Sequence, residues 1–323
     1  MKEIIIKNSD EDVRLDKYLR RLLPQAAGGF LYKMLRKKNI TLNGGKAKGN
    51  EKLKTGDNIR LYFSDETYEK LRGDGVSEEE WTRLEKAGGD IRVLYEDDDI
   101  IAVNKPAGLL TQKAHIEDIS LNEKLCARLI GQGALTKEGY ARFKPSAMNR
   151  LDRGTSGIVL CAKTPLGARR LSSAIAEGKV YKEYRCIVYG HFAKSGSIEA
   201  YIKKDEKNNT VEVFDSFEEG LTRIETIFEI VGEYENFTEL KAVLVTGKSH
   251  QIRAQLSHLG NPVVLDRKYG TRSDSQHYFL YPGQLLHAYR VKLWDGTEIV
   301  AKCPDIFEKL KRGEIWRPGL PEA

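Results

Sequence analysis

The chain has 323 residues, with 53 Lys and Arg against 47 Asp and Glu and a formal net charge of +6 at pH 7. This length is typical of two domains, and a hydrophobic content of 40% is enough for a sizeable core. No apolar run approaches the ~20 residues of a membrane-spanning helix, and residues 1–7 are too charged for a secretory signal. We therefore expect a cytoplasmic protein that does not associate with a membrane.

The cysteines and histidines lack the spacing of metal ligands. The four cysteines lie too far apart in sequence for a zinc site or a redox dithiol, and the six histidines form no ligand pattern on a helix. We expect reduced thiols and no bound metal ion.

The basic charge is concentrated near the N-terminus. Residues 1–64 contain 15 Lys and Arg against 7 Asp and Glu, a net charge of +8, whereas residues 65–90 contain 4 against 9, a net charge of −5. A basic concentration favours a polyanion partner, most simply a nucleic acid, although a solubilising surface would have the same composition. The acidic segment predicts a linker over residues 65–90 with one or two short helices, which Trp81 and Leu84 could anchor to either neighbouring domain.

Residues 1–64 predict a small α+β domain. Short strands are expected at residues 4–6, 40–46 and 53–63. Apolar residues at helical spacing predict helices over residues 12–23 and 30–38, and the last turn of the second helix is strongly basic.

This ordered set of elements resembles the S4-type RNA-binding domain. The matching runs are Arg14-Leu15-Asp16-Lys17-Tyr18-Leu19, Ile40-Thr41-Leu42-Asn43-Gly44 and Leu53-Lys54-Thr55-Gly56-Asp57-Asn58-Ile59. The resemblance implies RNA-binding side chains that face phosphates, which supply affinity without reading sequence. They are Lys33, Arg36, Lys37 and Lys38. A solvated helix end would have the same composition.

Residues 91–323 predict a larger α+β domain around a central mixed, mainly antiparallel sheet. The expected strands cover residues 92–97, 100–104, 158–162, 180–190, 198–203, 210–214, 222–231 and 238–245. Helices are expected over residues 120–130 and 166–177, and a polar loop over residues 131–145.

Asp152 lies between Arg150 and Arg153, directly before a buried strand. Neighbouring cations favour the charged form of a carboxylate, so we expect Asp152 to be ionised at neutral pH and available as a nucleophile. Gly154 and Gly157 permit a tight turn before the strand. Taken alone, the same pattern also fits a structural Arg–Asp ion pair.

A second polar segment, residues 246–253, opens a predicted helix from which Arg253 projects. The run Gly247-Lys248-Ser249 is similar to part of a phosphate-binding loop, but that motif needs glycine at position 242, where this chain has alanine. This spacing excludes a nucleotide hydrolase that uses Lys248 and Ser249. For His250 we favour a cap or hydrogen-bonding role over that of a general base.

Together, these segments resemble the RluA-type family of RNA pseudouridine synthases over about residues 91–310. The matching motifs are Asn104-Lys105-Pro106-Ala107-Gly108, Arg150-Leu151-Asp152-Arg153-Gly154-Thr155-Ser156-Gly157, Lys182-Glu183-Tyr184, Thr246-Gly247-Lys248-Ser249-His250-Gln251-Ile252-Arg253 and Leu286-His287-Ala288. The resemblance implies a pseudouridine synthase fold and isomerisation of uridine to pseudouridine without a cofactor or metal. Asn149 departs from the pattern, since many members have histidine there.

The resemblance also implies roles for individual residues. Asp152 would act on the sugar or base, Tyr184 would stack on the target uracil, and Arg253 would hold Asp152 in an ion pair. Residues that would contact the substrate are Arg150, Arg153, Thr155, Lys248, His250 and Gln251.

The family likeness favours a monomeric enzyme that modifies large-subunit (23S) ribosomal RNA. A transfer RNA synthase is the first alternative. A non-catalytic RNA-binding protein of ribosome assembly is the second, and the basic N-terminal domain alone would fit it.

Overall fold

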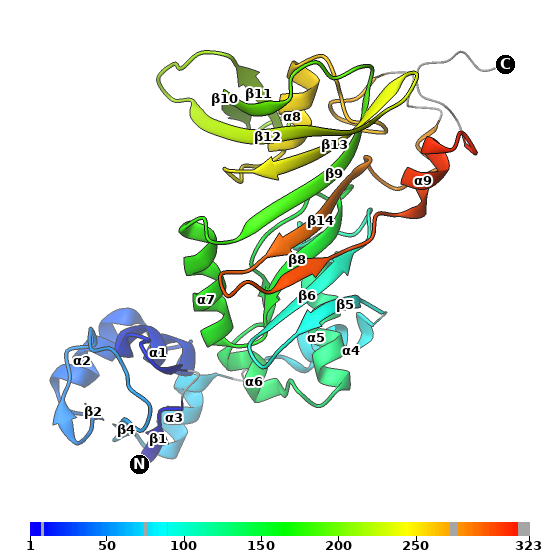
Figure 1. Cartoon of the computed structure of the whole chain (residues 1–323). Helices are drawn as coiled ribbons and strands as arrows, with labels where there is room; N and C mark the ends of the chain where they lie inside the picture. Colours follow the sequence, from blue (N-terminus) through cyan, green and yellow to red (C-terminus); the bar gives the residue numbers. More distant parts are fainter. Residues whose placement is uncertain (8–9, 74–75, 89, 272–276, 316–323) are drawn as a thin grey trace.

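The computed structural model describes residues 1–7, 10–73, 76–88, 90–271 and 277–315, which form two α+β units (Figure 1). A four-stranded sheet belongs to the N-terminal unit and an eleven-stranded sheet to the larger one. The predicted α+β class is therefore confirmed. Within these residues, no helix is both long and apolar enough to cross a membrane.

The N-terminal unit packs two helices against its small sheet. Its elements are β1 Lys2–Ile5, α1 Leu15–Leu22, α2 Gly28–Arg36, β2 Ile40–Leu42, β3 Gly45–Lys46 and β4 Asn58–Leu61, with strand order β1-β4-β2-β3. Helix α1 begins later than predicted because Asp12 has a φ of 61° and its N–H donates to Leu53 O at 2.8 Å. Helix α2 ends earlier than predicted, so Lys37 and Lys38 lie in the turn that follows it.

The acidic segment contains two helices, α3 Asp65–Arg72 and α4 Glu78–Lys86, each capped at its N-terminus by a serine hydroxyl. Tyr68 of α3 packs into the core of the N-terminal unit. Leu84 of α4 packs into the core of the larger unit, and the Trp81 ring meets the edge of Tyr140 at 6.3 Å between centroids. The segment is thus divided between the two cores.

The large sheet is mixed and mainly antiparallel, as predicted. Its strands are β5 Arg92–Glu96, β6 Ile100–Lys105, β7 Ser146–Ala147, β8 Ser156–Ala162, β9 Tyr181–Tyr189, β10 Gly196–Asp205, β11 Thr210–Phe214, β12 Thr222–Glu233, β13 Phe237–Leu244, β14 Leu286–Lys292 and β15 Glu298–Val300. The order along the sheet is β11-β10-β12-β13-β9-β14-β8-β6-β5, with β15 paired to β14 and β7 paired to β8. Among the strands described, only β8 and β14 are parallel neighbours.

Helices cover both faces of the sheet at the β5–β6–β8 end (Figure 1). The helices of this unit are α5 Leu121–Gly131, α6 Lys137–Arg142, α7 Pro165–Ala176, α8 Gln251–His258 and α9 Asp305–Lys311. Val159 and Cys161 of β8 pack with α5, whereas Ile158 and Leu160 pack with α7, so every residue of β8 is buried. This alternation is that of a strand covered on both faces.

The prediction of a loop over residues 131–145 was wrong for its middle part. Helix α6 forms there because Thr136 caps its first turn, with Gly139 N–H donating to Thr136 Oγ1 at 3.1 Å. The buried Tyr140 then packs against Trp81 of α4. A six-residue helix with a single buried apolar residue has too little periodicity to be recognised in the sequence.

Glycine is required where β8 passes β14. Gly157 has a φ of 111°, and a Cβ at this position would collide with the backbone of Ala288 in β14. One turn earlier, a Cβ on Gly154 would lie 3.0 Å from Gly283 Cα. The chain that leads into β8 is therefore pressed closely against the segment before β14.

We predict that Gly157→Ala lowers the free energy of unfolding by roughly 3 kcal/mol, because it combines a strained φ with a backbone collision. The matched control is Gly178→Ala after α7, where φ is 69° but nothing lies within 4 Å of the added Cβ. The control should lose only about 1 kcal/mol. Urea unfolding of both variants measures the difference, and equal losses would contradict the collision.

Candidate active site

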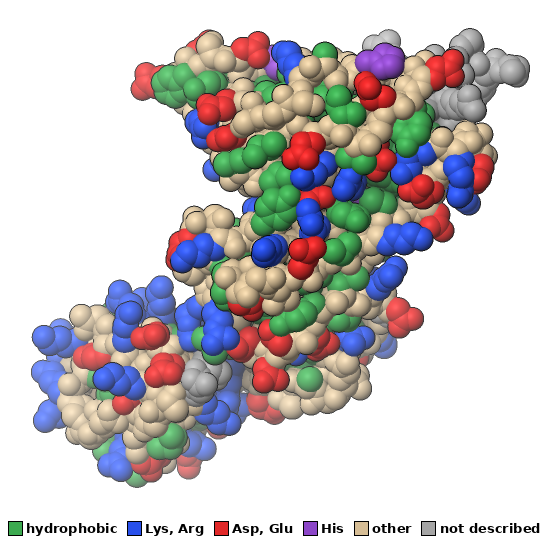
Figure 2. Space-filling model, in the orientation of Figure 1, with side chains coloured by type: hydrophobic (Ala, Val, Ile, Leu, Met, Phe, Trp, Pro, Cys, Tyr) green, Lys and Arg blue, Asp and Glu red, His purple; other side chains and the backbone are tan. Residues whose placement is uncertain are grey.

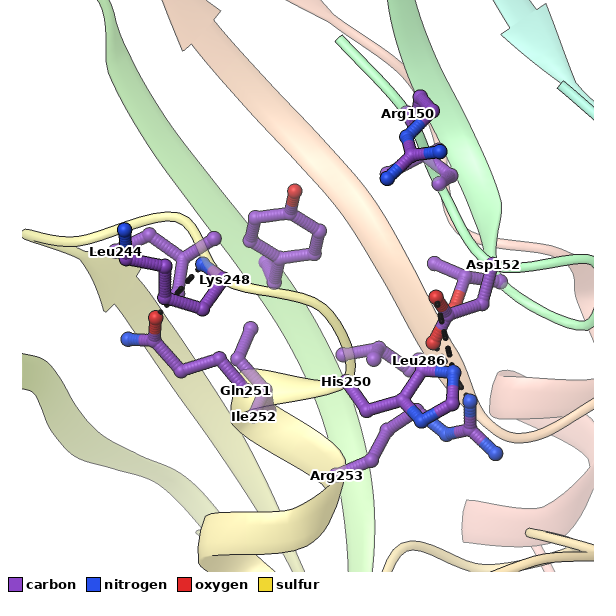
Figure 3. Close-up of a pocket in the computed structure, with 12 residues that line it drawn as sticks. Arg150, Asp152, Leu244, Lys248, His250, Gln251, Ile252, Arg253 and Leu286 are labelled. Atoms are coloured by element: carbon purple, nitrogen blue, oxygen red, sulfur yellow. Dashed lines mark hydrogen bonds and ion pairs between the residues drawn. The ribbon is translucent and has the colours of Figure 1, made fainter. Parts of the chain in front are cut away.

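A pocket lies between the loop before β8, strands β9, β13 and β14, and the first turn of α8 (Figure 3). Its lining residues are Arg150, Leu151, Asp152, Thr155, Tyr184, Leu244, Lys248, His250, Gln251, Ile252, Arg253 and Leu286. Arg150 and Asp152 lie on one side, and Leu244 and Lys248 lie across from them (Figure 3). Segments 101 residues apart in the sequence thus meet at one site, since Asp152 and Arg253 are in direct contact.

The pocket brings together most of the residues that the sequence singled out for catalysis or substrate contact. Those lining it are Arg150, Asp152, Thr155, Tyr184, Lys248, His250, Gln251 and Arg253. Arg153 is not among the lining residues, and its Nε donates to Gly108 O at 3.1 Å. The four basic residues at α2 belong to the N-terminal unit and do not line this pocket.

The loop that carries Asp152 is held through its backbone. Thr111 Oγ1 donates to Leu151 O at 2.8 Å and accepts from Leu151 N at 3.2 Å. Thr155 N donates to Asp152 O at 3.0 Å, which closes the turn. These bonds leave the carboxylate of Asp152 free to face the pocket.

Lys105, at the end of β6, holds the same loop through hydrogen bonds to backbone carbonyls. Its side chain is fully buried at the end of β6, and its Nζ donates to the carbonyls of Pro106 at 3.0 Å, Leu109 at 2.8 Å and Arg153 at 3.3 Å. Burial lowers the pKa of Lys105 to about 7, and the charge of Asp152 opposes this shift. The sequence motif contained Lys105, but only the structure shows that it satisfies three carbonyls around the loop.

Arg253 joins two carboxylates. Its Nη1 lies 2.6 Å from Asp152 Oδ2, while Nε and Nη2 contact the two oxygens of Asp266 at 2.6 and 2.7 Å. The bidentate pair fixes the guanidinium plane, so the third nitrogen is aimed at Asp152. Burial opposes the charge on Arg253, but Asp266 and Asp152 raise its pKa further above the usual range.

Asp266 is not among the residues predicted from the sequence, and the structure shows it buried and paired with Arg253. Burial alone would raise the pKa of Asp266, but hydrogen bonds and charge from Arg253 hold it below the usual value. The backbone N–H groups of Lys268 and Tyr269 also donate to Asp266 Oδ1, at 2.9 and 3.0 Å. The sequence feature that could have indicated Asp266 is its position directly after the apolar run Val263-Val264-Leu265.

His250 is a hydrogen-bonding partner, as expected, but its side chain does not cap α8. It occupies the N-cap position in a left-handed conformation, with φ 55°. Its Nδ1 lies 2.9 Å from Tyr269 Oη, and its Nε2 lies 3.8 Å from Asp152 Oδ1. Burial lowers the pKa of His250 and Arg253 adds to this effect, although Asp152 opposes it.

An aromatic and apolar wall completes the pocket. Tyr184 of β9 is buried, and this burial raises the pKa of its phenol well above the usual value. The negative charge of Asp152 raises it further, by a smaller amount. Its phenol is therefore protonated at neutral pH. Leu244, Ile252 and Leu286 line the same pocket and were not predicted as individual site residues.

Three polar side chains near the site are already engaged within the protein. Gln251 accepts from Lys248 N and Thr246 Oγ1 and donates to Glu225 O and Thr226 Oγ1, all within 3.0 Å. Thr155 and Asn149 also form hydrogen bonds within the protein. Thr155 Oγ1 accepts from Gln284 Nε2 at 2.7 Å, and Asn149 Oδ1 accepts from Leu160 N at 2.7 Å. Gln251 and Thr155 thus use these groups to hold the turns of the site, and their predicted contact with substrate stays a prediction.

The geometry suits a planar ring bound beside a carboxylate. Asp152 Oδ2 is held by Arg253, whereas Oδ1 receives no hydrogen bond from any residue that the structure describes. Tyr184 and the leucines offer an apolar wall, and Arg150 and Lys248 supply positive charge without an ion-pair partner in the described part of the chain. No group of three or more metal-ligating side chains is present within that part.

We predict that Asp266→Asn lowers the free energy of unfolding at pH 7 by about 3 kcal/mol, because it breaks a buried pair. The folded-state pKa of Asp266 is lowered. Its stabilisation is therefore complete above the unfolded value of about 3.9 and is lost as pH falls through the folded-state pKa. Urea unfolding between pH 7 and pH 3 should show a flatter pH dependence in the variant.

Asp215→Asn is the control, because Asp215 is exposed and pairs only with His258 in the described residues. It should change stability by less than about 1 kcal/mol. Equal effects of the two substitutions would contradict a central role for Asp266.

Solved structures with this fold are known from human proteins. The structure titled Human RNA Pseudouridylate Synthase Domain Containing 4 aligns with a TM-score of 0.54 at 20% identity, over 71% of this chain and 95% of that chain. Human RNA Pseudouridylate Synthase Domain Containing 1 aligns with a TM-score of 0.52 at 23% identity, over 67% and 83%. The larger unit therefore has the pseudouridine synthase fold.

Sequence relatives extend over nearly the whole chain. Ribosomal large subunit pseudouridine synthase C of Rickettsia felis is 34% identical over 311 residues, which cover 94% of this chain and 97% of that protein. The protein of the same name from Rickettsia prowazekii is 35% identical over 318 residues, covering 95% and 99%. An uncharacterized RNA pseudouridine synthase of Mycoplasma genitalium is 31% identical over 301 residues, covering 90% and 88%.

A match to the family described as RNA pseudouridylate synthase spans residues 99–258, which include Asp152, Tyr184 and Arg253. Together with relatives that match almost end to end, it shows that the chain belongs to the RluA-type family of RNA pseudouridine synthases, which are isomerases.

Proposed function

We propose that this protein isomerises specific uridines of large-subunit ribosomal RNA to pseudouridine. The observation that carries the proposal is the state of Asp152, whose Oδ1 is open to the pocket while Arg253 holds Oδ2 at 2.6 Å. Relatives named for large-subunit ribosomal RNA match nearly the full chain and support this choice of RNA. The enzyme would then work in the cytoplasm.

The reaction breaks the N1–C1′ bond of uridine, turns the uracil and rejoins it through C5. A carboxylate must attack the sugar or base, or assist loss of the ribose 2′ proton, and we assign this role to Asp152. Tyr184 would stack on the uracil. Because its phenol is protonated in the resting site, any removal of the C5 proton by Tyr184 would require prior loss of that phenolic proton.

A uridine within structured RNA must leave its stack to reach this pocket. Arg150 is exposed at the rim and would occupy the space that the flipped nucleotide leaves. Lys248, also at the rim, would contact a flanking phosphate. Arg153 lies outside the pocket and would contact RNA beyond the target nucleotide.

We further assign residues 1–64 to an S4-type RNA-binding domain and residues 91–323 to the catalytic domain. Figure 2 shows Lys and Arg side chains gathered over the N-terminal unit. Four basic side chains in α2 and the turn after it are exposed and form no ion pair with a described residue, so they are available to phosphates. They are Lys33, Arg36, Lys37 and Lys38. A single chain carries all these groups, and we take the monomer as the working unit.

We predict that Asp152→Asn abolishes product but leaves RNA binding intact, because the amide keeps the shape of the side chain without its charge. The assay is release of C5 tritium from labelled large-subunit ribosomal RNA that lacks pseudouridine, with binding measured on the same RNA. Product from the variant would overturn the assignment of Asp152.

Release by the wild type alone supports the proposal. Wild-type release from transfer RNA but not from ribosomal RNA would correct the substrate. Binding of ribosomal RNA without release from either RNA would instead indicate a non-catalytic assembly protein.

We predict that replacing Lys33, Arg36, Lys37 and Lys38 together by glutamine weakens RNA binding and reduces its salt dependence. Each lost phosphate contact should lower the slope of log K against log salt by roughly 0.7–0.9. The control is Lys241→Gln, since Lys241 is paired with Glu229 at 2.9 Å. An unchanged slope in the quadruple variant would place the RNA elsewhere.

A further inference from the structure

The orientation of the His250 ring is set by a chain of hydrogen bonds that begins outside the pocket. Val211 N–H donates to Tyr269 Oη at 2.7 Å, and this oxygen lies 2.9 Å from His250 Nδ1. The two rings meet edge to face at 5.6 Å between centroids. Tyr269 is itself anchored, since its N–H donates to Asp266 and its carbonyl accepts from Ser257 Oγ at 3.0 Å.

This chain of bonds favours one of the two nitrogens of His250 as the site of the proton. Tyr269 Oη accepts from the Val211 N–H, and no other described residue accepts its hydroxyl hydrogen, so Nδ1 is the acceptor within reach of that hydrogen. Nδ1 is then an acceptor, and the proton of the neutral imidazole resides on Nε2. Nε2 is the nitrogen on the pocket side, 3.8 Å from Asp152 Oδ1, which is too long for a hydrogen bond.

The Nε2–H group is therefore a donor at the pocket for which no described residue is an acceptor. A general base would need a lone pair on Nε2, and this tautomer has none there. A uracil ring offers two carbonyl oxygens, and negative charge reaches them when the electron pair of the N1–C1′ bond leaves with the ring. A fixed donor at such an oxygen is more effective as this charge develops than in the ground state.

We propose that His250, neutral and protonated on Nε2, donates a hydrogen bond to a carbonyl oxygen of the target uracil, and that Tyr269 is the positioning residue that fixes this tautomer. No proton is transferred in this interaction, so His250 stays neutral throughout. The proposal rests on the proposed function, because it takes a uridine as the occupant of the pocket.

The charges around His250 keep the ring neutral near pH 7. Asp152, whose Oδ1 lies 3.8 Å from Nε2, and the buried Asp266 both favour protonation. Arg253 from α8 and Lys268 from the following loop oppose protonation, and burial opposes it most strongly, so the pKa of His250 is lowered. The Tyr269 hydroxyl adds to this effect, since it donates only to the neutral form.

The first test is nitrogen-15 NMR of the histidine rings in the free protein, with the His250 signals assigned by their loss in His250→Gln. We expect a pyridine-type Nδ1 and a protonated Nε2 at pH 7 in the wild type. In Tyr269→Phe we expect a mixture of tautomers and a titration that moves to higher pH. A wild-type ring protonated on Nδ1, or charged at pH 7, would overturn the proposal.

The second test is tritium release as a function of pH. A protonated His250 would pair with Asp152 and engage its open oxygen, so activity should fall as this ring becomes charged. Tyr269→Phe should lower kcat on the order of tenfold, change KM little, and move the acid limb of the profile to higher pH. A merely structural role would lower the amount of active enzyme without moving the acid limb. An unmoved limb would therefore contradict the proposal.

His250→Gln tests the donor without altering Tyr269, so it keeps the proposal testable if Tyr269→Phe does not fold. Glutamine retains an N–H donor. It should keep more activity than His250→Ala, and equal losses would count against a donor role. The control is His258→Gln at the exposed end of α8, which should leave kcat and KM unchanged.

The two tests distinguish a wrong function of the protein from a wrong role of His250. A wild type that shows the expected tautomer but releases no tritium from ribosomal or transfer RNA defeats the proposed function, and the uracil contact with it. Release by the wild type with His250 protonated on Nδ1 overturns only the role of His250.

Discussion

The site depends on the buried contact between Asp266 and Arg253. Two charged groups taken out of water are costly unless their geometry and remaining hydrogen bonds are good. Here the pair is bidentate, and two backbone N–H groups complete the shell of Asp266. The arrangement leaves one guanidinium nitrogen to hold Asp152, so the position of that carboxylate depends on a residue that does not line the pocket.

The sheet supplies the rigidity that this contact needs. Strand β8 is buried on both faces, and its parallel pairing with β14 brings the loop of Asp152 close to β9, where Tyr184 lies. Gly157 makes that pairing possible, and Lys105 ties the same loop to the end of β6. Residues outside the pocket thereby hold the Asp152 carboxylate and the Tyr184 ring in place relative to each other.

The two units differ in charge. The larger unit has two cations at its pocket, Arg150 and Lys248, that form no ion pair with a described residue, whereas residues 1–64 have a net charge of +8. Under the proposed function, the N-terminal unit would contact phosphates and the larger unit would contact the base, as expected of an enzyme that holds a large RNA but acts on one nucleotide.

The sequence by itself determined the class of fold, the main strands and helices, and the segments that carry Asp152, Tyr184 and Arg253. It could do so because periodic apolar residues and ordered motifs are local properties of the chain. It missed α6, whose single buried tyrosine depends on a tryptophan of another helix.

Only the tertiary structure decided which polar groups are available. Gln251 and Thr155 form hydrogen bonds that hold turns, and Arg153 lies outside the pocket. Asp266 pairs with Arg253, and Tyr269 is a hydrogen-bonding partner of His250. Hydrogen bonds between distant segments determine whether a side chain is free, and their partners are fixed by packing that no local pattern records.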